Sequence, residues 1–95
     1  MKHEGKKTIL LVEDQVLIAT SKKIEMEKLG YDVVIADSGK KAVELVTGKA
    51  SFDLILMDIN LGIGVDGTEA AKTMIREYEI PIIFLSSKME TRLGA

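Results

Sequence analysis

Three short apolar runs, each followed by oxygen-bearing side chains, constrain this sequence more than any other feature. The runs cover residues 8–12, 54–57 and 82–85, and the residues that follow them are Glu13, Asp14, Asp58, Ser86 and Ser87. Unbroken apolar runs of this length are typical of strands that are covered on both faces. We therefore expect three strands that direct acids and hydroxyls to one edge of a sheet.

Amphipathic stretches alternate with these runs. We expect a helix over residues 15–29, ended by Gly30 in a left-handed conformation, and a strand over residues 31–36. Ser38 is the expected N-cap of a second helix, which runs through residue 46 and ends at Gly48. Asp66 and Glu69 have the spacing of a capping box for a third helix, through about residue 78.

The first helix is expected to cover the sheet with one side. On a helical wheel that side holds Leu17, Ile18, Ser21, Ile24 and Leu29, whereas Lys22 and Lys23 lie away from it. Strands that alternate with helices form a parallel sheet with helices on its faces. The predicted fold class is therefore α/β, with an open parallel sheet flanked by helices.

Composition limits the domain count and the function classes. Ninety-five residues, 46% of them hydrophobic, are enough for one domain over residues 1–95, and the polar residues 1–6 are expected to be disordered. The formal net charge of −2, with both signs interspersed, argues against binding to nucleic acid. The chain has no cysteine, no signal peptide and no apolar run near the roughly 20 residues that span a bilayer, so a cytoplasmic location is expected.

The strand ends predict a chemistry. If the strands that precede Asp14 and Asp58 are neighbours, their spacing of about 4.8 Å brings both carboxylates within reach of one ion. Clustered carboxylates repel one another unless a cation offsets their charge, and Mg²⁺ is a hard cation that takes oxygen ligands. Ser86, from the next strand, could donate a hydrogen bond to a phosphoryl group bound there.

These residues resemble a known family, the receiver domain of two-component response regulators. The resemblance runs from about Lys7 to Lys88, and the motifs that carry it are LVED, MDINL, the Asp66-Gly67 pair and PIIFLSS. It implies a flavodoxin-like fold with the second strand beside the first, then the third and the fourth.

The resemblance also implies roles and partners. Asp58 would accept a phosphoryl group from a phosphohistidine donor, which is a sensor histidine kinase or a histidine phosphotransfer protein. Asp14, Asp58 and the carbonyl of Asn60 would bind Mg²⁺, and Glu13 would reach the ion through water. Ser86 would bind the phosphoryl group, and the Asn60 side chain would tune its hydrolysis. The domain would catalyse only its own phosphorylation and dephosphorylation, without turnover of other substrates.

Two departures from the family pattern change these expectations. A glycine-rich loop, residues 61–65, replaces the usual methionine-proline pair, and the family's fifth strand, fifth helix and the lysine after that strand have no counterpart. Lys88 follows Ser86 too closely to be that lysine. We therefore expect a truncated receiver with impaired phosphorylation. Its fourth strand would be an exposed apolar edge, through which two copies could form a homodimer.

Two other functions remain open. A phosphatase of the haloacid-dehalogenase type also uses a nucleophilic Asp after a strand, but Asn60 stands where its general acid is expected. The other open function is a binding or dimerisation module whose carboxylates are vestigial.

Overall fold

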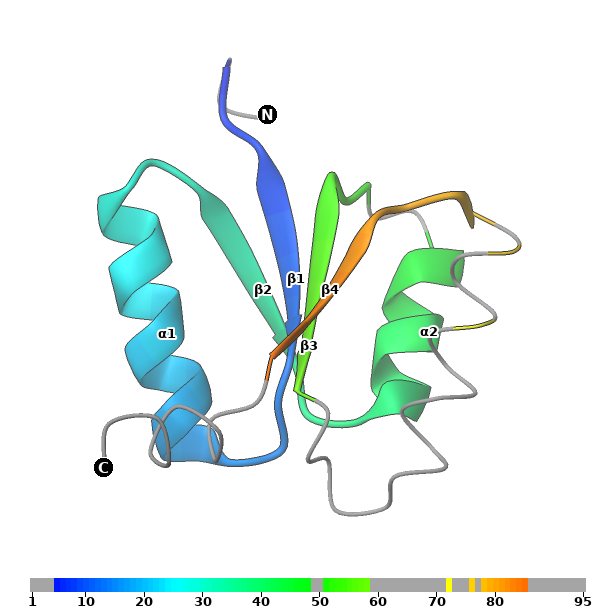
Figure 1. Ribbon diagram of the computed structural model, residues 1–95, viewed down its shortest axis with the longest axis horizontal. Coiled ribbons are helices and arrows are strands. Elements are labelled where there is room, and N and C mark those ends of the chain that lie inside the picture. Colours follow the sequence, from blue (N-terminus) through cyan, green and yellow to red (C-terminus); the bar gives the residue numbers. More distant parts are fainter. Residues whose placement is uncertain (1–4, 49–50, 59–71, 73–75, 77, 86–95) are drawn as a thin grey trace.

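Four parallel strands form a single sheet between two helices (Figure 1). This computed structural model describes residues 5–48, 51–58, 72, 76 and 78–85. Its elements are β1 (Thr8–Val12), α1 (Val16–Lys28), β2 (Asp32–Ala36), α2 (Gly39–Thr47), β3 (Leu54–Asp58) and β4 (Ile82–Leu85). The strand order is β2-β1-β3-β4, as the resemblance implies, and the predicted α/β class with an open parallel sheet is confirmed.

The two faces of the sheet bury separate apolar clusters. Alternate residues along β1 and β3 supply the larger cluster, which packs against α2. Its buried members are Leu10, Val12, Ala36, Ala42, Val46, Phe52, Ile55 and Met57. The smaller cluster lies under α1 and consists of Leu11, Ala19 and Val33. Among the described helices, none is long and apolar enough to cross a membrane.

The predicted buried side of α1 is wrong. Leu17 is 85% exposed and Leu29 is 76% exposed, whereas Ala19 is buried and Met26 packs against the cluster under the helix. The apolar residues of α1 lie on two opposite sides, so the wheel offers two candidate faces. The side that carries Ala19 packs on the sheet, and the side that carries Leu17 and Ile24 faces solvent.

The predicted ends of the two helices are confirmed. Gly30 has a φ of 101°, and its N–H donates to the Glu27 carbonyl oxygen at 3.0 Å. The Tyr31 N–H donates to the Met26 carbonyl oxygen at 3.2 Å, which completes a Schellman motif after α1. At the start of α2, the Ser38 hydroxyl accepts from the Lys41 N–H at 3.1 Å.

The predicted third helix and the loop before it lie largely outside the described residues. Of that helix, residues 72, 76 and 78 are described and are helical. Glu79, directly after them, has a φ of 55°. A left-handed residue at this place ends a helix, and the chain then enters β4 through Pro81.

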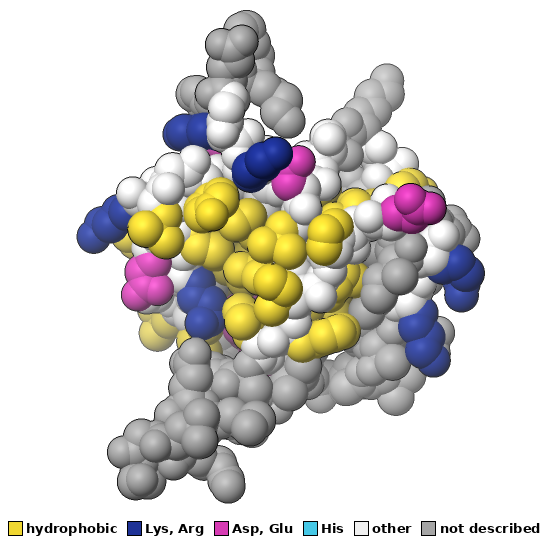
Figure 2. All heavy atoms as spheres, turned by 45° about the horizontal axis from the view of Figure 1, so that its top comes forward, with side chains coloured by type: hydrophobic (Ala, Val, Ile, Leu, Met, Phe, Trp, Pro, Cys, Tyr) yellow, Lys and Arg dark blue, Asp and Glu magenta, His cyan; other side chains and the backbone are white. Residues whose placement is uncertain are grey.

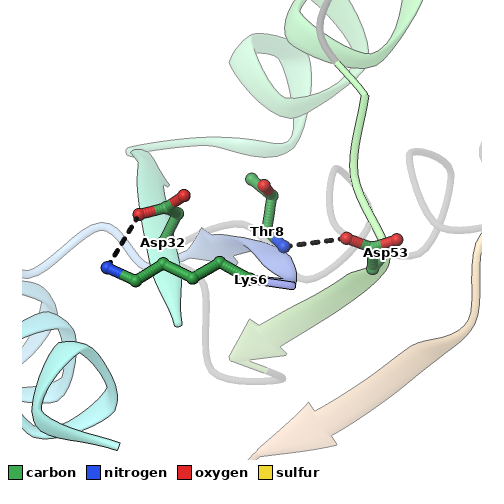
Figure 3. A network of polar contacts seen from close by, with 4 residues as sticks. All are labelled: Lys6, Thr8, Asp32 and Asp53. Atoms are coloured by element: carbon green, nitrogen blue, oxygen red, sulfur yellow. Dashed lines mark hydrogen bonds and ion pairs between the residues drawn. The ribbon is translucent and has the colours of Figure 1, made fainter. Parts of the chain in front are cut away.

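Polar contacts tie the strands together at the amino end of the sheet (Figure 3). The Thr8 N–H donates to Oδ2 of Asp53 at 2.8 Å, and the Asp53 N–H donates to the Thr8 carbonyl oxygen at 2.8 Å. Lys6 forms an ion pair with Asp32 at 3.8 Å. These contacts lie at the starts of β2 and β3, at the opposite end of the sheet from Glu13 and Asp58.

The Ser38 cap gives the first testable prediction. Ser38→Ala leaves the Lys41 N–H without its side-chain acceptor, so we expect the free energy of unfolding to fall by about 1 kcal/mol. Urea denaturation followed by circular dichroism measures this change. Ser21→Ala, in the exposed middle of α1, is the matched control and should not destabilise the protein. Equal losses for both variants would contradict a capping role for Ser38.

Candidate functional site

The register between β1 and β3 brings the predicted acids together. Val12 pairs with Met57, so the residues that follow them in the chain, Glu13 and Asp58, lie at the same level of the sheet. The ladder continues one residue beyond β1, because the Glu13 N–H donates to the Ala36 carbonyl oxygen of β2 at 2.9 Å. This bond to β2 fixes the backbone from which the Glu13 side chain leaves.

Three carboxylates meet at this edge, as the sequence predicts. Ligand oxygens of Glu13, Asp14 and Asp58 all lie within 4.8 Å of one another. Glu13 is 2% exposed and Asp58 is 4% exposed, whereas Asp14 is open to solvent. The cluster therefore has a buried floor of two acids and one acid at its rim.

Hydrogen bonds hold the buried acids in place. The Gln15 N–H donates to Oε2 of Glu13 at 3.1 Å, and the carboxyl groups of Glu13 and Asp58 share a hydrogen bond. Among the described residues, no buried side-chain oxygen or nitrogen lacks a hydrogen-bond partner. The sequence did not predict the bond from Gln15, because that donor is a backbone group and any residue there could supply it.

The ionisation of Glu13 reports the crowding of negative charge. Burial, followed by the hydrogen bond with Asp58, raises the pKa of Glu13 from 4.5 to about 7. The charges of Asp58 and Asp14 contribute smaller parts of this rise in pKa, and the bond from the Gln15 N–H opposes it. Near neutral pH the cluster therefore holds a proton or requires a cation.

The donor set fits a hard divalent cation. All three groups offer carboxylate oxygens, which Mg²⁺ prefers, and the cluster contains no nitrogen or sulfur ligand. The exposure of Asp14 leaves one side of the cluster open, as a site that also takes water or a phosphoryl oxygen requires. Asn60 and Ser86, the other predicted site residues, lie outside the described residues, as do Ser87 and Lys88.

The raised pKa predicts how the stability of the metal-free protein depends on pH. Because the pKa of Glu13 is higher in the folded state than in the unfolded one, its protonation stabilises the folded state. This contribution to the free energy of unfolding is complete below about pH 4.5 and is lost as the pH rises through about 7. We expect the free energy of unfolding in EDTA to decrease over this interval, and Glu13→Gln to reduce that decrease. Urea denaturation at a series of pH values measures both.

Glu27→Gln is the matched control for this prediction. Glu27 is an exposed glutamate on α1, so its replacement should leave the pH dependence of stability unchanged. If the free energy of unfolding of Glu13→Gln decreased with pH as much as that of the unmodified chain, Glu13 would not be the group that holds the proton.

Comparison with known proteins identifies the family of this chain. The family model for the response regulator receiver domain matches residues 9–94. The chain is 44% identical to the N-terminal domain of a response regulator/sensory box/GGDEF three-domain protein from Carboxydothermus hydrogenoformans. The match has a TM-score of 0.79 and covers 85% of this chain and 65% of that one. The chain thus spans less than two thirds of that relative.

Two further solved structures show the same fold. The response regulator TrrA from Thermotoga maritima, in complex with Mg²⁺ and BeF, is 29% identical, with a TM-score of 0.76 over 85% of this chain and 70% of that one. The non-phosphorylated HemR receiver domain from Leptospira biflexa is 30% identical, with a TM-score of 0.75 over 94% of this chain and 73% of that one. The chain belongs to the response regulator receiver domain family of two-component signalling.

Proposed function

We propose that Asp58 accepts a phosphoryl group from a phosphohistidine donor in a reaction that depends on Mg²⁺. The observation that carries this proposal is the meeting of three carboxylates, within 4.8 Å, where β1 and β3 end. Only Asp58 among them belongs to a regular strand, in which it pairs with Leu85 of β4. A nucleophile needs such fixed placement for in-line attack.

The reaction is a nucleophilic displacement at phosphorus. A carboxylate oxygen of Asp58 forms a bond to phosphorus as the bond from phosphorus to the donor's imidazole nitrogen breaks, and the imidazole leaves with the electron pair. The product is an aspartyl phosphate. Because Asp58 is almost fully buried, the incoming phosphoryl group must approach from the open side of the cluster, where Asp14 lies.

The same acids would hold the metal ion. Asp14, Asp58 and the backbone carbonyl of Asn60 would bind Mg²⁺ directly, and Glu13 would bind it through water. When bound, the ion would shield the carboxylates and orient the phosphoryl oxygens. Ser86 would donate a hydrogen bond to the phosphoryl group, and the Asn60 side chain would tune its hydrolysis. TrrA, whose structure contains Mg²⁺ and BeF, supports this assignment through its similarity to the chain.

Receiver domains work with histidine kinases or histidine phosphotransfer proteins, so we propose one of these as the donor. A second copy of the chain is the other proposed partner, at the sheet edge formed by β4. A cytoplasmic location, in keeping with a chain that contains no cysteine, completes the proposal.

Asp58→Asn tests the acceptor directly. We expect incubation with Mg²⁺ and a small phosphodonor such as acetyl phosphate to add one phosphoryl group to the chain. Asp58→Asn should abolish this addition, because an amide is a poor nucleophile. Intact mass spectrometry measures the added group, and peptide mapping locates it.

Asp37→Asn is the matched control, because Asp37 follows β2 at the same edge of the sheet but is not a member of the acidic cluster. This variant should be phosphorylated like the unmodified chain. Phosphorylation that persisted in Asp58→Asn would place the acceptor elsewhere. Continuous release of phosphate over many turnovers would instead indicate a phosphatase, and no modification at all would indicate a binding module.

A further inference from the structure

The backbone N–H of Gln15 contacts the acidic cluster although Gln15 is not one of its acids. It donates to Oε2 of Glu13 at 3.1 Å, from a position two residues further along the chain. Gln15 is the N-cap of α1, with an extended backbone (φ −97°, ψ 115°), and its side chain makes no capping hydrogen bond. The bond to Glu13 is therefore made by the main chain of Gln15 and does not need the glutamine side chain.

Three hydrogen bonds limit how the Glu13 carboxylate is oriented. The Glu13 N–H donates to the Ala36 carbonyl oxygen at 2.9 Å, Oε2 accepts from Gln15, and the carboxyl group shares a hydrogen bond with Asp58. Glu13 is also 2% exposed, so the close-packed atoms around it leave little space for another rotamer. Glu13 thus enters the cluster with Oε2 already bonded to the chain.

This bond limits how Glu13 can bind an ion. A cation at Oε2 would lie beside the positive hydrogen of the Gln15 N–H, and charges of the same sign repel one another. The bond therefore leaves Oε1 as the favoured oxygen of Glu13 for an ion. One ligand oxygen from each of Glu13, Asp14 and Asp58 is enough to form the cluster, in which these atoms lie within 4.8 Å of one another.

We propose that the Gln15 N–H is a positioning group that makes the acidic cluster select Mg²⁺ over Ca²⁺. This inference rests on the proposed function, in which the cluster binds Mg²⁺. Mg²⁺ keeps several waters and binds through one or two carboxylates, whereas Ca²⁺ takes about six to eight oxygen ligands, often with both oxygens of one carboxylate. By holding Oε2, the Gln15 N–H denies Ca²⁺ a bidentate glutamate and removes no ligand that Mg²⁺ needs.

The described part of the chain offers an ion one such cluster. Glu13, Asp14 and Asp58 are the one group of three acids that it brings this close together. Figure 2 turns the amino ends of the strands toward the reader, and on that face the acidic side chains stand apart from one another, among apolar and basic ones. A divalent ion that binds the described residues is therefore expected at the carboxyl end of the sheet.

The affinities of the full chain for two ions test the proposal. Isothermal titration calorimetry with Mg²⁺ alone and with Ca²⁺ alone measures both dissociation constants. The unmodified chain should bind Mg²⁺ about tenfold more tightly than Ca²⁺. Gln15→Pro removes the N–H donor and should reduce this ratio at least about threefold, because Oε2 becomes available to Ca²⁺. A merely structural effect would weaken both ions alike and leave the ratio unchanged.

Two variants are the matched controls. Gln15→Ala keeps the backbone N–H and should keep the ratio of the unmodified chain. Val16→Pro makes the same proline replacement one residue further on, at the first position of α1, where proline is tolerated. The extended backbone of Gln15 also suits a residue that precedes proline. Val16→Pro keeps the Gln15 N–H, so it should leave the ratio unchanged.

Hydrogen exchange of the unmodified chain gives a second measurement. Proline favours a φ of about −65°, and the φ of Gln15 is −97°, so this measurement decides the question if Gln15→Pro does not fold. With saturating Mg²⁺, nuclear magnetic resonance should show the Gln15 amide exchanging at least about tenfold more slowly than the Val16 amide. The Val16 N–H is at the start of α1 and has no partner within the helix.

Two results would overturn this inference alone. One is a ratio in folded Gln15→Pro that equals the ratio of the unmodified chain, and the other is a Gln15 amide that exchanges as fast as that of Val16 in Mg²⁺. Circular dichroism confirms the folding of each variant. Failure of the unmodified chain to bind either ion would instead overturn the metal dependence of the proposed function, and this inference with it.

Discussion

The parallel pairing of β1 with β3 is the constraint on which the site depends. It places Val12 opposite Met57, so that Glu13 and Asp58 leave the sheet at the same level. The apolar residues of both strands are buried on the two faces of the sheet, and this burial makes a shift in register costly. Apolar packing thus holds two carboxylates together that would repel one another in solution.

Acids at the two ends of the sheet differ in their burial and in their partners. Asp32 and Asp53, at the amino end, are partly or fully exposed, and each pairs with a cation or a backbone N–H. Glu13 and Asp58, at the carboxyl end, are buried, and this burial, followed by the hydrogen bond between them, raises the pKa of Glu13. The crowded acids at the carboxyl end therefore call for a cation, whereas those at the amino end already have partners within the chain.

Much of the fold follows from the sequence because short apolar runs and caps are local signals. The bounds of β1 and β4 and the caps at Gly30 and Ser38 agree with prediction. The buried side of α1 was not predictable from its wheel, because apolar residues lie on two opposite sides and only contact with the sheet selects one. Sequence likewise gives no sign that Glu13, rather than its neighbour Asp14, is the buried acid, since that depends on how far the ladder with β2 continues.

The central claim is that the buried carboxylates form a cation site. The stabilisation of the protein by Mg²⁺ at two pH values tests this claim most directly. The melting temperature would be measured with and without Mg²⁺ at about pH 5 and about pH 8, below and above the pKa of about 7 for Glu13. Mg²⁺ should raise the melting temperature clearly at pH 8 and much less at pH 5, where the proton on Glu13 competes with the ion. No rise at pH 8, or an equal rise at both pH values, would contradict a cation site built on these acids.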